Sequence, residues 1–155
     1  MTHLTRKTLI LMAAGGSAAL LLGAFFFQMI GFPPCAMCLW QRWPHAVAVV
    51  LGLVAYRFGG AAICYLGALA AATTGGLGLY HTGVERDWWE GPTSCTGTGG
   101  GLGDLSGADL LSTDVTVVMC DQVSWQFMTL SMASWNFVAS AVLVALWIMA
   151  ARKPA

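Results

Sequence analysis

Two of the five cysteines, Cys35 and Cys38, stand in a C-x-x-C spacing directly after Pro33 and Pro34. Proline cannot continue a preceding helix, so an extended approach is expected, with a helix starting at once after the pair. Thiols at a helix N-terminus meet the positive end of the helix dipole, which stabilises the thiolate that attacks disulfides or donates to an electron acceptor. The spacing therefore predicts a redox-active dithiol, with a structural disulfide as the alternative.

Arg42 follows Cys38 by four residues, which places both on one face of a helix. A cation at that position lowers the pKa of Cys38 further. An arginine at a membrane boundary is costly unless it is paired or reaches the interface, so Arg42 is a functional candidate. The alternative is an interface anchor beside Trp40 and Trp43.

Cys95 and Cys120 bracket a glycine-rich run at residues 96–103, which we expect to be a flexible tether. A stabilising disulfide gains nothing from a flexible loop, whereas disulfide shuttling requires movement. We therefore expect a mobile pair that docks onto an outside protein, with structural loop closure as the alternative.

Three further residues have chemistry to offer. Cys64 lies in an apolar run and is expected to be a small packing residue with no part in the reaction. His45 shares the face of Arg42 and could line a headgroup site or simply pack. His81 opens an acidic segment and is a similar case.

The composition predicts a membrane protein of one domain, residues 1–155. The chain is 57% hydrophobic and 9% charged, whereas soluble domains carry about 25% charged residues. So few charges cannot cover a surface of this size in water. The net charge of zero argues against a nucleic-acid partner.

Four apolar segments, at about residues 8–30, 39–57, 61–80 and 127–151, are predicted to cross about 30 Å of hydrocarbon as an all-α four-helix bundle. The second is awkward, because 14 residues separate Arg42 from Arg57. They cover only about 21 Å, so this helix must begin near Cys38 or Leu39.

The charges predict the orientation of these spans. All seven acids lie between residues 85 and 121. The positive-inside rule places the basic ends and both termini in the cytoplasm, and the loops at about 31–38 and 81–126 outside. The four cysteines outside the spans then all face the compartment where disulfides persist. The basic residues that carry this prediction are Arg6, Lys7, Arg57, Arg152 and Lys153.

Residues 34–42, PCAMCLWQR, resemble the P-C-x-x-C-x-x-Q-R signature of the disulfide bond formation protein B (DsbB) family, the quinone-linked membrane thiol oxidases. Residues 80–85 are similar to the start of that family's second periplasmic loop. Residues 120–125 and 130–136 are similar to its loop end and fourth-helix start. The loop between Cys95 and Cys120 is shorter and richer in glycine than expected of the enterobacterial form.

This resemblance implies a protein-disulfide:quinone oxidoreductase of the bacterial inner membrane. It would oxidise the dithiol of a periplasmic thioredoxin-like, DsbA-type partner and pass the electrons to ubiquinone or menaquinone. Cys35 and Cys38 would be the quinone-proximal pair. Cys95 and Cys120 would face the partner, with Cys95 forming the mixed disulfide.

The resemblance also implies a quinone site around Arg42, which would hold and polarise the quinone. Gln41, His45 and His81 are further expected contacts of the quinone.

Three other functions were weighed against this one. An enzyme of the vitamin K epoxide reductase type also combines a C-x-x-C with outer-loop cysteines in a helical bundle. The Gln41-Arg42 pair that follows the C-x-x-C and the order of the loops argue against it. A non-enzymatic tetraspan protein with structural disulfides is the second. The third is a metal-handling membrane protein that uses Cys35 and Cys38. We expect no metal there, because the sequence offers no convincing further ligands at metal-site spacing.

Overall fold

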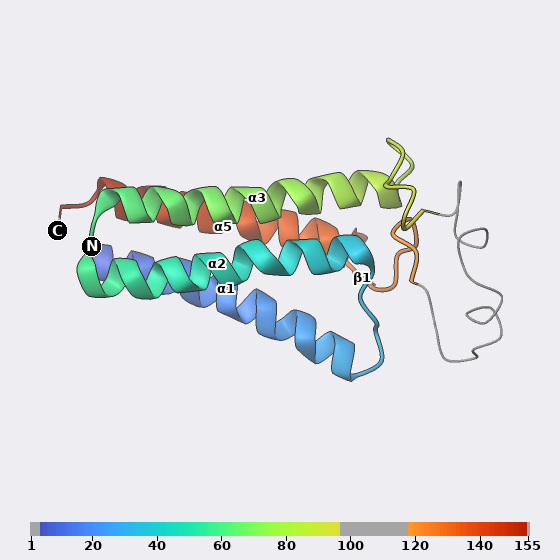
Figure 1. Cartoon of the computed structure of the whole chain (residues 1–155), viewed down its shortest axis with the longest axis horizontal. Helices are drawn as coiled ribbons and strands as arrows, with labels where there is room; N and C mark the ends of the chain where they lie inside the picture. Colours follow the sequence, from blue (N-terminus) through green and yellow to red (C-terminus); the bar gives the residue numbers. More distant parts are fainter. Residues whose placement is uncertain (1–3, 97–117, 155) are drawn as a thin grey trace.

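The computed structural model describes residues 4–96 and 118–154, which form four long helices and one short hairpin. The helices lie side by side, with both chain ends at one end of the bundle and the cysteine-bearing loops at the other (Figure 1). We call the latter the cysteine end. The elements are α1 (Arg6–Met29), α2 (Ala36–Phe58), α3 (Ala61–Glu85), β1 (Gln126–Phe127), β2 (Leu130–Ser131) and α5 (Met132–Arg152).

Three of these helices, α1, α3 and α5, are long and apolar enough to cross a membrane. This confirms a helical membrane protein. The remaining helix, α2, has 23 residues, which span about 34 Å. Gln41, Arg42 and His45 make the half of α2 nearest the cysteine end more polar than the other helices.

The start of α2 lies slightly earlier than predicted. The helix begins at Ala36 rather than near Cys38 or Leu39, and Cys35 is its N-cap. The Cys35 sulfur accepts a hydrogen bond from the Cys38 backbone N–H at 3.2 Å, which satisfies one of the free donors of the first turn. Both cysteines of the C-x-x-C are therefore fixed on the first turn of one helix.

Two other helix ends differ from the predicted spans. Helix α3 continues past Tyr80 to Glu85, so His81 lies on the helix rather than opening a loop. Helix α5 begins at Met132 rather than near residue 127, because the preceding residues form a hairpin. Met128 and Thr129, with φ angles of 50° and 65°, make its two-residue turn.

Small residues bring α3 and α5 into close contact. A Cβ atom at Gly67 would lie 2.7 Å from the Trp147 indole. A Cβ at Gly78 would lie 3.0 Å from the backbone oxygen of Ala133. Cys64 is fully buried in the apolar core beside Trp147, which confirms it as a packing residue.

Candidate active site

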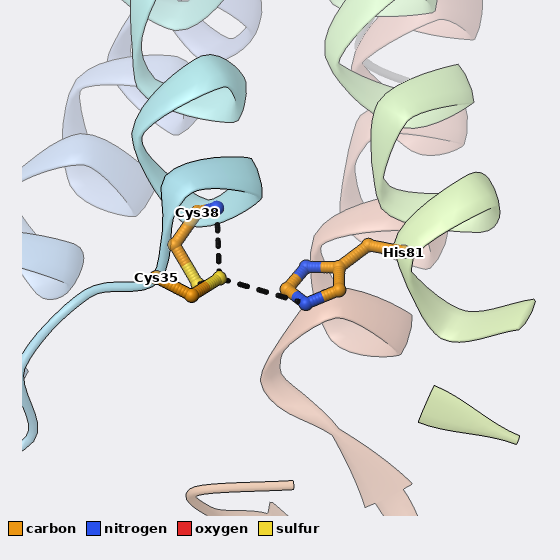
Figure 2. A group of neighbouring side chains, drawn as sticks. All are labelled: Cys35, Cys38 and His81. Atoms are coloured by element: carbon orange, nitrogen blue, oxygen red, sulfur yellow. Dashed lines mark hydrogen bonds between the residues drawn. The ribbon is translucent and has the colours of Figure 1, made fainter. Parts of the chain in front are cut away.

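Cys35 and Cys38 lie at the cysteine end and face His81 from the neighbouring helix α3 (Figure 2). Both cysteines are free thiols, and their sulfurs are 2.7 Å apart. Disulfide sulfurs are about 2.05 Å apart, so forming the bond requires only a small further approach. The His81 Nε2 atom is 3.7 Å from the Cys35 sulfur.

The two thiols differ in acidity. A hydrogen bond to Cys38 and then burial raise the pKa of Cys35 far above its usual value. The same hydrogen bond lowers the pKa of Cys38, because its sulfur accepts from the Cys35 thiol. Arg42 lowers the pKa of Cys38 as well, but its effect is smaller than that of Cys35. Cys38 is therefore the more acidic thiol of the pair, and the main cause is the hydrogen bond from the Cys35 thiol.

Arg42 turns toward α1 rather than toward the cysteines. Its Nη1 donates to the Gln28 Oε1 at 2.8 Å, and its Nη2 donates to the Ala24 carbonyl at 3.3 Å. The guanidinium also lies over the Phe25 ring, 4.9 Å from its centroid. These contacts hold the last turns of α1 against α2.

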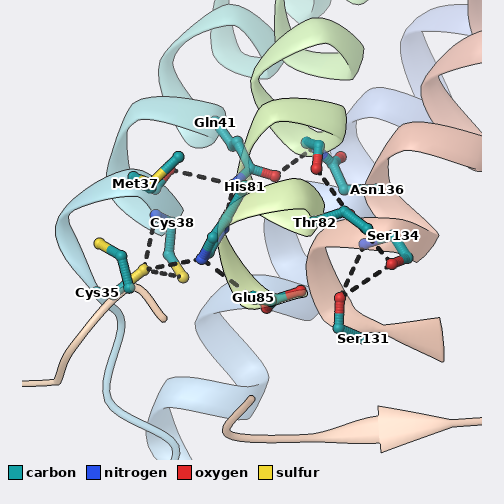
Figure 3. Close-up of polar contacts among 12 residues, drawn as sticks. Cys35, Met37, Cys38, Gln41, His81, Thr82, Glu85, Ser131, Ser134 and Asn136 are labelled. Atoms are coloured by element: carbon teal, nitrogen blue, oxygen red, sulfur yellow. Dashed lines mark hydrogen bonds and ion pairs between the residues drawn. The ribbon is translucent and has the colours of Figure 1, made fainter. Parts of the chain in front are cut away.

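A chain of amide hydrogen bonds connects His45 to His81 across three helices. Figure 3 shows Asn136, Gln41 and His81 of this chain. The His45 Nε2 lies 2.8 Å from the Asn136 Oδ1 on α5, and the Asn136 Nδ2 donates to the Gln41 Oε1 at 2.7 Å. The Gln41 Nε2 lies 3.0 Å from the His81 Nδ1. This chain ties α2, α3 and α5 together beside the C-x-x-C.

Glu85 lies one helical turn beyond His81, with its Oε1 at 3.8 Å from the His81 Nε2. It also reaches Ser131, the N-cap of α5. Glu85 and Asn136 are not among the predicted site residues. The i, i+4 spacing of His81 and Glu85 is a local signal for that pair. The partners of Asn136, His45 and Gln41, lie on another helix, and no spacing along the chain indicates them.

Cys95 and Cys120 form a disulfide in the structure. Both are buried, with exposed fractions of 4% and 0%, and they pack in one cluster with Cys35, Met37 and Val84. The predicted mobile pair therefore lies against the first pair in this arrangement. Residues 97–103 of the predicted glycine tether, 96–103, lie outside the described residues.

A cavity of about 110 Å³ lies beside the C-x-x-C and is lined by residues of α1, α2, α3 and α5. Its size is similar to that of a cavity of about 150 Å³ that holds benzene. Six of the eight predicted site residues line it, namely Cys35, Cys38, Gln41, Arg42, His45 and His81. Cys95 and Cys120 are not among its lining residues.

Three residues that line the cavity have a buried polar atom that lacks a hydrogen-bond partner within the described residues. These atoms are the His45 Nδ1, the Arg42 Nε and the Glu85 Oε2. Buried polar groups are normally hydrogen-bonded, so the two nitrogens suit a ligand with polar oxygens on an apolar ring. A quinone headgroup fits this donor and acceptor set.

The fold supplies a third potential metal ligand that the sequence argument did not consider. The ligand atoms of Cys35, Cys38 and His81 all lie within 4.8 Å of one another. The spacing along the chain conceals this, because 42 residues separate Cys38 from His81. The absence of further ligands is therefore not a sound reason to dismiss a metal.

Comparisons with known proteins agree with the resemblance. The family model described as "Disulfide bond formation protein DsbB" matches residues 6–150. The disulfide bond formation protein B of Azoarcus sp. (strain BH72) is 29% identical, over 96% of this chain and 95% of that protein. The protein of the same name from Xanthomonas oryzae pv. oryzae (strain MAFF 311018) is 31% identical, over 86% of this chain and 83% of that protein. No solved structure matches the chain significantly.

Proposed function

This chain belongs to the disulfide bond formation protein DsbB family, and we propose that it oxidises the dithiol of a periplasmic thioredoxin-like disulfide oxidase and delivers the electrons to membrane quinone. Membership implies a thiol oxidase that forms disulfides through its cysteine pairs. The observation that carries the finer proposal is the packing of both pairs in one cluster beside the cavity. Membership also favours this function over an enzyme of the vitamin K epoxide reductase type.

The proposed orientation places the cysteine end in the periplasm and both termini in the cytoplasm. The two chain ends lie together at the opposite end of the bundle (Figure 1). The basic residues Arg6, Arg57 and Arg152 lie at the same end, because they begin α1 and end α2 and α5. Lysine and arginine mark cytoplasmic ends, which supports an inner-membrane protein in which α2 also crosses.

The first step is exchange with the partner at Cys95. A partner thiolate attacks the Cys95 sulfur, the Cys95–Cys120 bond breaks, and Cys120 leaves as a thiolate. The partner's second thiolate then attacks the partner sulfur that is bonded to Cys95. Cys95 leaves as a thiolate, and the partner leaves with its own two cysteines joined in a disulfide. Because Cys95 is buried in the structure, this step requires the loop pair to move away from Cys35.

The second step returns the loop pair to the disulfide. It starts from the oxidised form of the first pair, in which Cys35 and Cys38 are bonded. A loop thiolate attacks the Cys35 sulfur, and Cys38 leaves as a thiolate. The other loop thiolate then attacks the loop sulfur of this mixed disulfide, so the loop disulfide re-forms and Cys35 leaves as a thiolate. The packing of Cys35 against Cys120 supports this choice of sulfur. The lowered pKa of Cys38 makes it the better leaving group of the two.

The third step re-forms the Cys35–Cys38 disulfide. Bound quinone supplies a two-electron, two-proton acceptor. Arg42 would hold a quinone oxygen, since its Nε is buried in the cavity lining without a partner in the described chain. The His45 Nδ1 would accept a hydrogen bond from a hydroxyl group at the same site. Gln41 and His81 complete the polar wall of the cavity.

Anaerobic turnover tests the proposal. Purified protein in detergent is mixed with a reduced thioredoxin-like oxidase and quinone, and the absorbance of quinone is followed together with the partner's thiol content. We expect one quinone reduced per partner disulfide formed. Cys38→Ser should abolish the reaction, whereas Cys64→Ala, a matched change in the buried core, should retain it. Normal turnover in Cys38→Ser would refute the mechanism.

A non-enzymatic tetraspan protein makes the opposite prediction for a glutathione titration. Redox-active pairs equilibrate with a glutathione couple, whereas structural disulfides resist reduction. Resistance of both pairs, with no quinone reduction, would establish the structural role.

A further inference from the structure

The hydrogen bonds around Gln41 and Asn136 fix which end of each amide carries the nitrogen. The Gln41 Nε2 lies 3.2 Å from the Met37 backbone oxygen, and the Asn136 Nδ2 lies 3.2 Å from the Thr74 backbone oxygen. A backbone carbonyl only accepts hydrogen bonds, so the atom facing it must be the amide nitrogen. Both amides are therefore oriented independently of the histidines.

These orientations determine the protonation of His81. The Gln41 Nε2 donates one hydrogen to Met37 and directs the other at the His81 Nδ1, 3.0 Å away. The Nδ1 must then be an acceptor, which leaves the ring neutral with its proton on Nε2. The groups around Nε2 fit this assignment, because the Cys35 sulfur, the Glu85 Oε1 and the Cys120 backbone can all accept.

We propose that Asn136, acting through Gln41, holds His81 as the neutral tautomer protonated on Nε2, so that His81 donates a hydrogen bond to the Cys35 sulfur and cannot serve as a metal ligand. Asn136 takes part because its Nδ2 donates to the Gln41 Oε1 at 2.7 Å, which keeps the Gln41 nitrogen facing His81. Asn136 and Gln41 are positioning residues, and His81 is the group that touches the reacting sulfur.

The His81 Nε2–H donor suits the re-oxidation of Cys35 and Cys38, and this part of the inference rests on the proposed function. The Cys35 thiol must lose its proton before its sulfur can bond to Cys38 again. An N–H group directed at that sulfur stabilises the thiolate as it forms. The two electrons and two protons of the reduced pair leave to the bound acceptor.

The same tautomer protects the reduced pair from soft divalent cations. Two thiolates and an imidazole within 4.8 Å are typical of a zinc site. To bind a metal through Nε2, the His81 ring would need a lone pair on Nε2 and its proton on Nδ1. The Nδ1–H of a metal-bound histidine normally donates to a hydrogen-bond acceptor. Gln41 instead presents a donor to Nδ1. The Gln41 donor that keeps the His81 proton on Nε2, facing the Cys35 sulfur, therefore also opposes metal binding at His81.

The tautomer can be observed directly by ¹⁵N NMR of reduced, histidine-labelled protein in detergent, with His81→Ala to assign the signals. We expect His81 to carry its proton on Nε2. Asn136→Asp cannot donate to the Gln41 Oε1, so Gln41 should turn its nitrogen toward the new carboxylate and the His81 proton should move to Nδ1. Ser134→Ala, which removes a buried hydrogen bond two residues away on α5, should leave the signal unchanged.

Zinc titration of the reduced protein, without quinone or partner, provides the second readout. Gln41→Glu accepts from Nδ1–H and should bind Zn²⁺ about 10- to 100-fold more tightly than the unaltered protein, the usual effect of a partner behind a metal-bound histidine. Gln41→Met removes the donor without adding charge and should also gain affinity. The gain should disappear when Cys38→Ser is added to either variant.

Several results would overturn the inference. They are an Nδ1 proton on His81 in the unaltered protein, an unchanged tautomer in Asn136→Asp, and a zinc gain in Gln41→Glu that is absent from Gln41→Met. The last would assign the gain to charge alone. None of these measurements involves turnover, so a protein that shows this tautomer yet fails to reduce quinone would refute the proposed function alone.

Discussion

Replacing Gly78 with alanine tests the close approach of α3 and α5 that holds Asn136 beside Gln41. The added Cβ would lie 3.0 Å from the Ala133 backbone oxygen, 3.1 Å from the Phe137 backbone nitrogen and 3.2 Å from the Asn136 Nδ2. Two of these three atoms are backbone and cannot yield by a rotamer change. The helices must therefore separate by a few tenths of an ångström.

Overpacking of this kind costs about 1–3 kcal/mol, while alanine returns up to about 1 kcal/mol of helix propensity relative to glycine. We expect Gly78→Ala to lower the free energy of unfolding by about 1 kcal/mol (the difference of these two effects). It should also slow thiol oxidation, because the displaced Asn136 loosens its bond to Gln41.

Gly76→Ala is the matched control. It lies on the same helix, and a Cβ there meets nothing within 4 Å. The control should gain the helix propensity alone, so the two variants should differ by about 2 kcal/mol. Thermal unfolding in detergent, followed by circular dichroism, should separate their midpoints by about 4–8 °C. Equal midpoints would refute the claim that α3 and α5 are in limiting contact at Gly78.

Three further predictions address the reaction. Arg42→Lys keeps the charge but loses the paired hydrogen bonds to α1. The quinone concentration for half-maximal rate should therefore rise about 10-fold, equivalent to about 1.4 kcal/mol. An unchanged quinone requirement in Arg42→Ala would mean that Arg42 is only an anchor at the membrane interface. Because the pKa of Cys38 is lowered, its alkylation should persist below the usual pKa of a thiol and be lost only as pH falls through the lowered value. Mass spectrometry across pH should find Cys38 modified before Cys35, and Cys35→Ala should move the profile to higher pH; modification of Cys35 first would contradict the assignment. Shortening the glycine-rich segment 97–103 should slow exchange between the two pairs in rapid-mixing experiments while quinone binding is retained, and equal exchange rates would exclude a role for its length.

The helices and the first cysteine pair could be predicted because their signals are local. Runs of apolar residues indicate membrane-spanning helices, and the prolines before Cys35 mark a helix start. The predicted start near Cys38 or Leu39 is slightly late, because it rests on the helix length needed to cross the bilayer and a cysteine sulfur is not among the usual N-caps. In the structure it caps Ala36–Phe58 nevertheless.

The site residues that were missed depend on contacts between distant parts of the chain. Asn136 bonds to Gln41 across 95 residues, and no alternation or spacing reveals such a pair. Helix α3 was ended too early because hydropathy falls at His81. The helix continues because His81 and Thr82 find polar partners on α2 and α5. Polarity there indicates partners inside the bundle rather than a loop in water.

The burial of the Cys95–Cys120 disulfide against Cys35 has a consequence for which thiols could donate electrons in the proposed cycle. In this closed arrangement the sulfurs of Cys35, Cys95 and Cys120 are all nearly inaccessible, with exposed fractions of 3%, 4% and 0%. Small thiols dissolved in the surrounding water can react with them only when the loop pair opens, so they equilibrate slowly and short-circuit the pathway poorly. A macromolecule with enough binding energy to move the disulfide away from Cys35 gains access faster, so in the proposed cycle protein substrates are oxidised in preference to metabolites.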